Sequence, residues 1–366
     1  MDAFRALSDR VAAHPNWCAL LLGVIAACGF QPLALWPLTI IAVAGLVALA
    51  AKAATWKKAA LAGWLFGVGH FALGNNWIAT AFTYQAEMPA WLGWIAVILL
   101  SLFLAVYPAL ATTGAWLIRR YGSKDAGSGG IAFGLAFAGC WILSEWVRSW
   151  LFTGFAWNPL GMILLGGFDT QGVALVAPWI GTYGLSGLAV ILSVLLLALV
   201  QAIMAGPMRR RLLAGTAGIA AACALIAIMV LPASYLPPQT GGIAYTLVQP
   251  DVRQENLDNP ALFETHFLKT ARLTVPRKAG QQRVVFWPES GIPDYLRDGY
   301  PKYLYRQMTY AGDPALARQR IGKVIGLHGL LLTGTVDLVM HKGDDIAARN
   351  SVTAIDGRGS IVASYS

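Results

Sequence analysis

The chain has 366 residues, of which 57% are hydrophobic and only 12% are charged. Soluble domains average about 25% charged and 45–50% apolar residues, so this composition excludes a wholly soluble protein. The formal net charge of +9 comes partly from basic residues that stand in short clusters between apolar runs rather than on one face, so no nucleic-acid partner is expected.

The first 232 residues contain about seven apolar runs that are each predicted to cross a membrane. A helix needs roughly 20 apolar residues to span a hydrocarbon core of about 30 Å. The predicted spans are 17–29, 35–51, 59–80, 91–118, 131–152, 183–204 and 212–231. The first is short and has an alternative interpretation as a signal peptide, because Ile25-Ala26-Ala27-Cys28 imitates a lipoprotein cleavage site. The segment 152–182 is expected to dip into the outer interface.

The basic residues of the connecting loops predict how the spans are oriented, since Lys and Arg favour cytoplasmic loops. They occur in alternate connections only: Arg5 and Arg10; Lys52, Lys57 and Lys58; Arg119, Arg120 and Lys124; Arg209, Arg210 and Arg211. The N-terminus is therefore predicted to be cytoplasmic. With seven crossings, everything after Pro232 lies on the other side, which in a bacterium is the periplasm.

A polar region follows a seam at residues 232–242, so we expect domains at 1–232 and 233–366. Short β-rich runs at 243–249, 283–287, 330–336 and 352–355 are predicted strands, and 356–364 is a predicted hairpin. Helices are expected at 260–274 and within 300–327. This alternation predicts a layered α/β domain, and we expect it to be incomplete because its last element has no visible closure.

Glu289 is the strongest catalytic candidate in the polar region. It directly follows the apolar run Val284-Val285-Phe286-Trp287, and α/β sheets present functional side chains at the carboxyl ends of strands. A carboxylate there, shielded by Trp287, is suited to act as a general base. The alternative is an ordinary solvated loop glutamate.

Several polar and aromatic residues of the apolar region also have two interpretations. Glu145 and Arg148 share a helix face and are either a structural ion pair or a headgroup-binding pair. Trp157 either lines a lipid-entry groove or belongs to the interfacial aromatic belt. Interhelical hydrogen bonding is the expected role of His70, Asn75 and Asn76. All four cysteines lie in apolar runs without metal spacing, so neither a disulfide framework nor a metal site is expected.

Five segments carry a resemblance to a known family. They are Asn75-Asn76-Trp77-Ile78, residues 144–157 from Ser144 to Trp157, Leu247-Val248-Gln249, the segment 287–293 beginning Trp287-Pro288-Glu289, and Thr333-Gly334-Thr335-Val336-Asp337. With these segments the chain resembles the bacterial apolipoprotein N-acyltransferases. The resemblance implies a multi-span helical membrane bundle followed by an incomplete, periplasmic, nitrilase-like αββα domain in the inner membrane of a bacterium.

The resemblance also implies a reaction: the sn-1 acyl chain of a phospholipid passes through a thioester to the amine of a diacylglyceryl-cysteine apolipoprotein. It requires a Glu-Lys-Cys triad without cofactor or metal. Glu289 matches the base, and Gly154, Phe155, Trp157 and Asn350 match substrate-binding positions. The triad lysine and cysteine are expected beyond residue 366, so this chain alone is predicted to be inactive. The alternatives are a non-catalytic lipid- or lipoprotein-binding scaffold and, with less support, a transporter.

Overall fold

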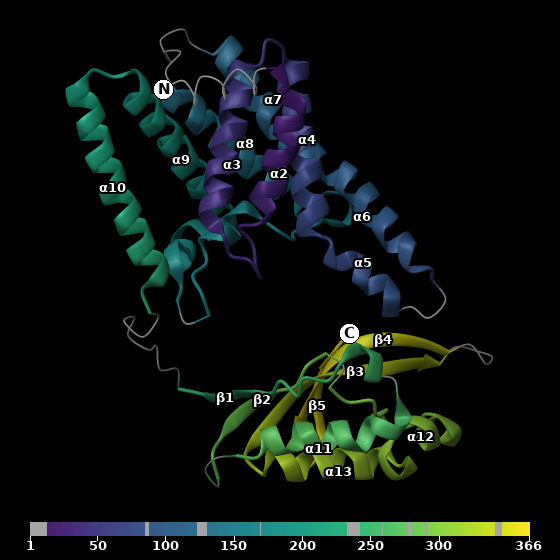
Figure 1. Cartoon of the computed structure of the whole chain (residues 1–366). Coiled ribbons are helices and arrows are strands. Elements are labelled where there is room, and N and C mark those ends of the chain that lie inside the picture. The colour runs from purple at the N-terminus through teal and green to yellow at the C-terminus, as the bar shows by residue number, and fades with distance from the viewer. Residues whose placement is uncertain are drawn as a thin grey trace. The chain divides into compact units, whose positions relative to one another are not determined.

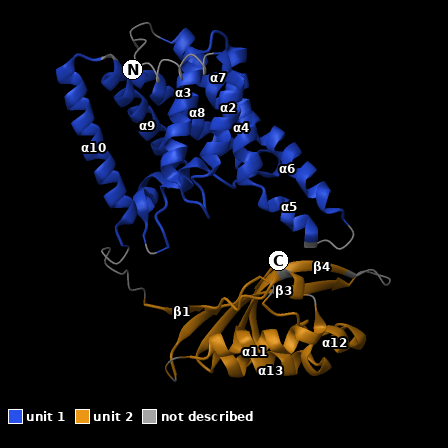
Figure 2. Cartoon of the chain, in the orientation of Figure 1, with its two compact units in different colours: residues 1–237 blue, residues 238–366 orange. Residues whose placement is uncertain are grey.

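The structure is a computed structural model that describes residues 13–84, 88–122, 130–168, 170–232, 242–257, 259–276, 278, 280–289, 291–340 and 346–366. The chain divides into two compact units, residues 1–237 and residues 238–366 (Figure 2). The predicted seam overlaps this division, but residues 233–241 lie outside the described part. Each unit is considered by itself below.

The first unit is a bundle of α-helices (Figure 1). Its helices are α2 Pro15–Ala27, α3 Trp36–Lys52, α4 Trp56–Gly74, α5 Trp77–Ala81, α6 Ala90–Leu104, α7 Val106–Tyr121, α8 Gly130–Arg148, α9 Ala177–Ala205 and α10 Met208–Val230. Four helical stretches of the described residues are long and apolar enough to cross a membrane: Ala90–Tyr121, Gly130–Arg148, Gly172–Met204 and Met208–Val230. The chain is therefore a membrane protein. The shorter apolar helices α2 and α3 occupy the first two predicted spans, and the count of seven crossings stays a prediction.

Glycines on α4 allow its neighbours to approach closely. A Cβ on Gly63 would lie 2.5 Å from the carbonyl oxygen of Pro108 on α7, and one on Gly67 would lie 2.7 Å from the Cα of Ala105. The hydroxyl of Thr112 on α7 donates to the Ala59 carbonyl oxygen at 2.9 Å. Helix association within lipid relies on such close packing and interhelical hydrogen bonds, because burial of apolar side chains gives little advantage there.

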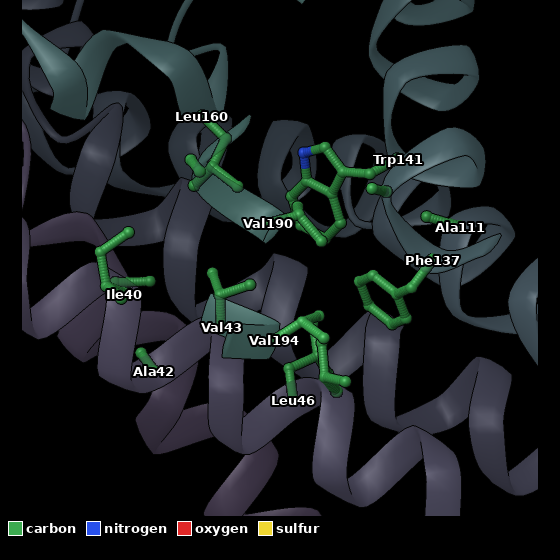
Figure 3. Packing of buried hydrophobic residues seen from close by; sticks show 14 of the residues in the cluster. Ile40, Ala42, Val43, Leu46, Ala111, Phe137, Trp141, Leu160, Val190 and Val194 are labelled. Carbon is green, nitrogen blue, oxygen red and sulfur yellow. The ribbon is translucent and has the colours of Figure 1, made fainter. Parts of the chain in front are cut away.

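The core of the first unit brings together residues from helices far apart in sequence. Figure 3 shows Val43 and Leu46 of α3, Phe137 and Trp141 of α8, and Val190 of α9 in one cluster. The rings of Phe137 and Trp141 stack with centroids 6.0 Å apart. This core fixes α8, the helix that carries Glu145 and Arg148.

The connection between α8 and α9 contains three short 3₁₀ helices: η2 Leu151–Thr153, η3 Leu160–Leu164 and η4 Gly172–Val176. Within the described residues it has no spanning helix of its own, although its last piece, η4, runs into α9. Its predicted dip into an interface stays a prediction.

The second unit contains one five-stranded sheet in the order β1-β2-β3-β4-β5. The strands are β1 Ala244–Leu247, β2 Arg283–Phe286, β3 Gly329–Met340, β4 Ile346–Asp356 and β5 Ile361–Tyr365. The first three are parallel to one another, whereas β4 is antiparallel to both of its neighbours, β3 and β5. The two long strands exceed their predicted bounds, because their pairing continues to Met340 and Ile346 beyond the apolar stretch that signalled them.

Helices cover one face of this sheet (Figure 1). They are α11 Phe263–Thr274, α12 Lys302–Met308 and α13 Pro314–Ile325, with short 3₁₀ helices η6 Gln254–Asn256, η7 Pro260–Leu262 and η8 Tyr310–Gly312. Pro314 begins α13, where a missing N–H costs nothing, and the Asp313 carboxylate caps it by accepting from Ala315 N at 2.7 Å. Val285, Leu331 and Ile355 of the sheet are fully buried against these helices. The predicted fold class, a membrane helical bundle followed by an α/β domain, is confirmed.

Candidate active site

The carboxyl ends of two neighbouring strands place Gln249 and Glu289 at one edge of the sheet. Leu247 at the end of β1 pairs with Phe286 at the end of β2, and Phe286 pairs with Leu332 in β3. The chain continues as Val248-Gln249 after β1 and as Trp287-Pro288-Glu289 after β2. Parallel strands present such following residues at a common edge, which is where α/β proteins bind ligands.

Asn350 contacts Glu289 at this edge. Its side-chain nitrogen Nδ2 donates to Oε1 of Glu289 at 2.6 Å. The two residues are 61 positions apart, and they meet because Asn350 on β4 pairs with Val336 on β3. Two of the predicted site residues are therefore brought together, and the hydrogen bond restricts the rotamer of an exposed carboxylate.

Gly334 allows the Glu289 backbone to lie against β3. An added Cβ would be 2.5 Å from the Glu289 carbonyl oxygen and 2.7 Å from its Cα, both far inside van der Waals contact. The Thr333-Gly334-Thr335 segment of β3 therefore packs directly against the backbone of the loop that carries Glu289. Ser290, the residue after Glu289, lies outside the described part of the chain.

Trp287 anchors the strand end rather than covering the carboxylate. Its ring is only 5% exposed and packs edge-to-face on Phe267 of α11, with centroids 6.1 Å apart. Its indole Nε1 donates to the Thr274 hydroxyl at 2.8 Å. The expected shielding of Glu289 by Trp287 is therefore wrong, because the indole's polar edge faces the helix layer and Glu289 is exposed.

Two cavities meet at Glu289. One of about 360 Å³ is lined by Glu289 and Asn350 together with Gln249, His266, Tyr295 and Met308. The other, of about 420 Å³, shares Glu289, Asn350 and Gly334 with the first. Its remaining lining residues are Phe286, Trp287, Leu332, Thr333, Ser351, Val352 and Tyr365. His266, Tyr295 and Met308 were not expected from the sequence. The signal for His266 in the sequence is its spacing from Phe263 and Thr270, which puts all three on one face of the predicted helix, and both of these residues also line the cavity.

Asp294 supports the wall of the first cavity. Its carboxylate accepts from Tyr310 N at 2.6 Å. Burial raises the pKa of the Asp294 carboxyl, although the hydrogen bond from Tyr310 and the nearby Arg320 guanidinium oppose that shift. The Arg320 guanidinium itself lies between two rings, 3.4 Å from the centroid of Phe267 and 4.0 Å from that of Tyr310.

The remaining predicted site residues lie in the first unit, in the segment after α8. Gly154 has φ +79, and its added Cβ would collide with the Ser149 carbonyl, so glycine is required there twice over. Phe155 packs on the cluster of Phe71, Leu104 and Tyr107. Trp157 is 62% exposed and lies edge-to-face with Trp77, with centroids 5.6 Å apart.

The hydrogen bonding between helices that was expected of His70 on α4 and of Asn75, which directly follows α4, is not found in that form, because Asn75 bonds to the segment between α8 and α9. Asn75 Oδ1 accepts from Asn158 Nδ2 at 3.0 Å. His70 is buried among the rings of Phe30, Phe66 and Phe71. Its Nδ1 has no hydrogen-bond partner in the described structure. No group of three or more His, Cys, Asp and Glu side chains within the described ranges is arranged to hold a metal ion.

Comparison with known proteins gives matches over most of the chain. Residues 22–195 match the family described as "Apolipoprotein N-acyltransferase N-terminal domain". Proteins named apolipoprotein N-acyltransferase match over longer stretches. The one from Ralstonia nicotianae is 33% identical over 76% of this chain and 50% of its own length. The one from Allorhizobium ampelinum is 32% identical over 82% and 52%, and that from Rhodopseudomonas palustris 30% identical over 95% and 62%.

The fold and site define an integral membrane protein whose helical bundle precedes an α/β unit with a carboxylate at the end of a parallel strand. The chain belongs to the apolipoprotein N-acyltransferase family. It spans between half and 62% of the length of these relatives.

Proposed function

We propose that this protein takes part in N-acylation of bacterial apolipoproteins at the inner membrane, with a phospholipid as acyl donor and a diacylglyceryl-cysteine apolipoprotein as acceptor. The relatives' names support the reaction class, and the apolar helices suit lipid substrates. The observation that carries the proposal is the Asn350–Glu289 hydrogen bond at the meeting of two cavities. By the charge pattern of its loops, the N-terminus is cytoplasmic and the second unit periplasmic.

Glu289 acts as the general base in this proposal. Because Asn350 holds Oε1, Oε2 is the oxygen that takes the proton of a thiol. The thiolate attacks the sn-1 ester carbonyl, the C–O bond breaks, and the lysophospholipid leaves with the proton from Glu289. The lipoprotein amine then attacks the thioester, forming the amide and releasing the thiolate, while Glu289 takes the amine proton. By the resemblance, the thiol belongs to a triad cysteine and a triad lysine stabilises the oxyanion.

Gly154, Phe155 and Trp157 are proposed to bind the acyl donor. Phe155 fixes the segment through the apolar cluster beneath it, and the exposed Trp157 ring contacts lipid. Asn350 is proposed to contact substrate as well as Glu289, because it lines both cavities.

The test measures thioester formation by the protein expressed from its whole gene. The protein is reconstituted with a phospholipid that is labelled in its sn-1 chain. Glu289→Gln keeps the hydrogen bond from Asn350 but cannot take a proton, so it should abolish the labelled thioester. The control is Glu255→Gln, an exposed glutamate of the same unit that lines neither cavity. Near-normal labelling of Glu289→Gln would exclude Glu289 as the base. Lipid or lipoprotein binding without any thioester in the unaltered protein would favour the scaffold alternative.

A further inference from the structure

Glu145 and Arg148 are charged residues inside the membrane bundle for which the proposed chemistry has no use. They are 5% and 2% exposed on α8. Ionisable groups in a membrane-spanning helix are costly and usually serve a function. The closest approach of the guanidinium to the carboxylate is 4.0 Å, so each group has better hydrogen-bond partners elsewhere.

The Arg148 guanidinium binds the backbone of the segment that ends at Asn158. Its Nη1 donates to the carbonyl oxygen of Trp157 at 2.9 Å, and its Nη2 approaches that of Asn158 at 3.5 Å. The Arg148 carbonyl oxygen accepts from Phe155 N at 2.8 Å. A planar guanidinium can serve two adjacent carbonyl groups at once, whereas an ammonium is a single point charge.

Glu145 holds the other end of the same segment. Its Oε1 accepts from Leu160 N at 2.8 Å and from the indole nitrogen of Trp141 at 3.0 Å. Between the two charged anchors, the Asn158 side chain donates to the Gly74 carbonyl oxygen at 3.0 Å. Residues 157–160 are thus attached to α8 at both ends. The Arg148 cation binds backbone carbonyl oxygens, and the Glu145 anion binds a backbone N–H group.

These contacts decide between the two interpretations of the pair. Arg148 is buried and its donors face backbone carbonyls, so it does not present its charge to a phosphate group. What it does is fix the backbone on either side of the Trp157 carbonyl, while the Trp157 ring stays 62% exposed. An exposed aromatic ring on a fixed backbone is suited to bind an apolar chain at low entropic cost.

We propose that Arg148 and Glu145 are positioning residues that set the place of Trp157 for binding of the phospholipid donor. This inference rests on the proposed role of Trp157. It predicts that the affinity for phospholipid depends on the shape of the Arg148 side chain and not only on its charge.

The test uses the full chain in mixed micelles and a phosphatidylethanolamine that carries a diazirine in its sn-1 chain. Photolabelling of the peptide that contains Trp157 is titrated against lipid, and the melting temperature is measured in parallel. Arg148→Lys should raise the half-saturating lipid concentration about tenfold, the effect expected for loss of a charge-assisted hydrogen bond, with a melting transition that remains cooperative and with unchanged maximal labelling. Arg120→Lys, on the exposed end of α7, is the matched control and should titrate like the unaltered protein.

If Arg148→Lys does not fold, Arg148→Gln removes the buried charge and should show the same shift. A titration of the folded Arg148 variant that matches the unaltered protein would overturn the inference, provided that Trp157→Ala weakens labelling. If Trp157→Ala itself titrates normally, the proposed role of Trp157 in donor binding fails, and the positioning role fails with it.

Discussion

Gly334→Ala is expected to displace the candidate base, although Gly334 has no side chain of its own to lose. The new methyl group would lie 2.5 Å from the Glu289 carbonyl oxygen and 2.7 Å from Glu289 Cα, where ordinary contacts begin at 3.4 Å. The obstructing atoms are backbone, so either β3 or the Glu289 loop must move by roughly 1 Å. A movement of that size breaks the 2.6 Å hydrogen bond between Asn350 and Glu289.

Overpacking of this kind costs about 1–3 kcal/mol. Amide hydrogen exchange reports local free energy, so peptides covering residues 283–289 and 329–340 should exchange roughly 5- to 150-fold faster in Gly334→Ala. Gly242→Ala is the control, because its methyl group would meet nothing within 4 Å in the same unit. Unchanged exchange in both peptides of Gly334→Ala would refute the argument that Gly334 sets the position of Glu289.

Two further substitutions test the support of the site. Thr274→Val leaves the buried indole N–H of Trp287 without its acceptor, so the second unit should lose about 1–3 kcal/mol of stability; hydrogen exchange no faster than in the unaltered protein would contradict this. Burial raises the pKa of the Asp294 carboxyl in the folded protein. The contribution of this carboxyl to the free energy of unfolding is therefore complete below the unfolded pKa of about 3.9 and is lost as the pH rises through the folded pKa. Asp294→Asn keeps an acceptor for Tyr310 N, so denaturation of the second unit should depend less on pH between mildly acidic and neutral conditions; a variant less stable than the parent at pH 7 would count against the reasoning.

Much of the fold follows from local sequence pattern. Apolar runs near 20 residues long gave the membrane helices, and Val284-Val285-Phe286 gave β2, because both elements are signalled by their own side chains. The position of Glu289 at a strand end was predictable for the same reason. The length of β3 and β4 was not, because Asp337 and Arg349 are polar residues that become strand only through pairing with each other's strand.

The contacts that define the site depend on chain geometry that no local pattern reveals. Asn350 meets Glu289 only because the hairpin register places it opposite Val336. Arg148 reaches the carbonyl groups of residues 157 and 158 because the intervening chain reverses through positive φ at Phe152 and Thr153, a conformation that these residue types rarely adopt. The expectation that Trp287 shields Glu289 is wrong because the partner of its indole, Thr274, lies on a helix whose packing against the strand no local pattern specifies.

Glu289 and Trp157 are both exposed residues that a neighbouring polar side chain holds in place. Each is exposed, as a group that reaches a substrate must be, and an exposed side chain ordinarily has much conformational freedom to lose on binding. In both places a neighbouring polar group restricts the exposed residue: the Asn350 amide holds a carboxylate oxygen, and the Arg148 guanidinium holds the Trp157 backbone. Part of the ordering cost of substrate binding is therefore met during folding. It follows that substitutions at Gly334 and Arg148, whose proposed role is to position Glu289 and Trp157, should weaken function through geometry, even where the variants remain folded.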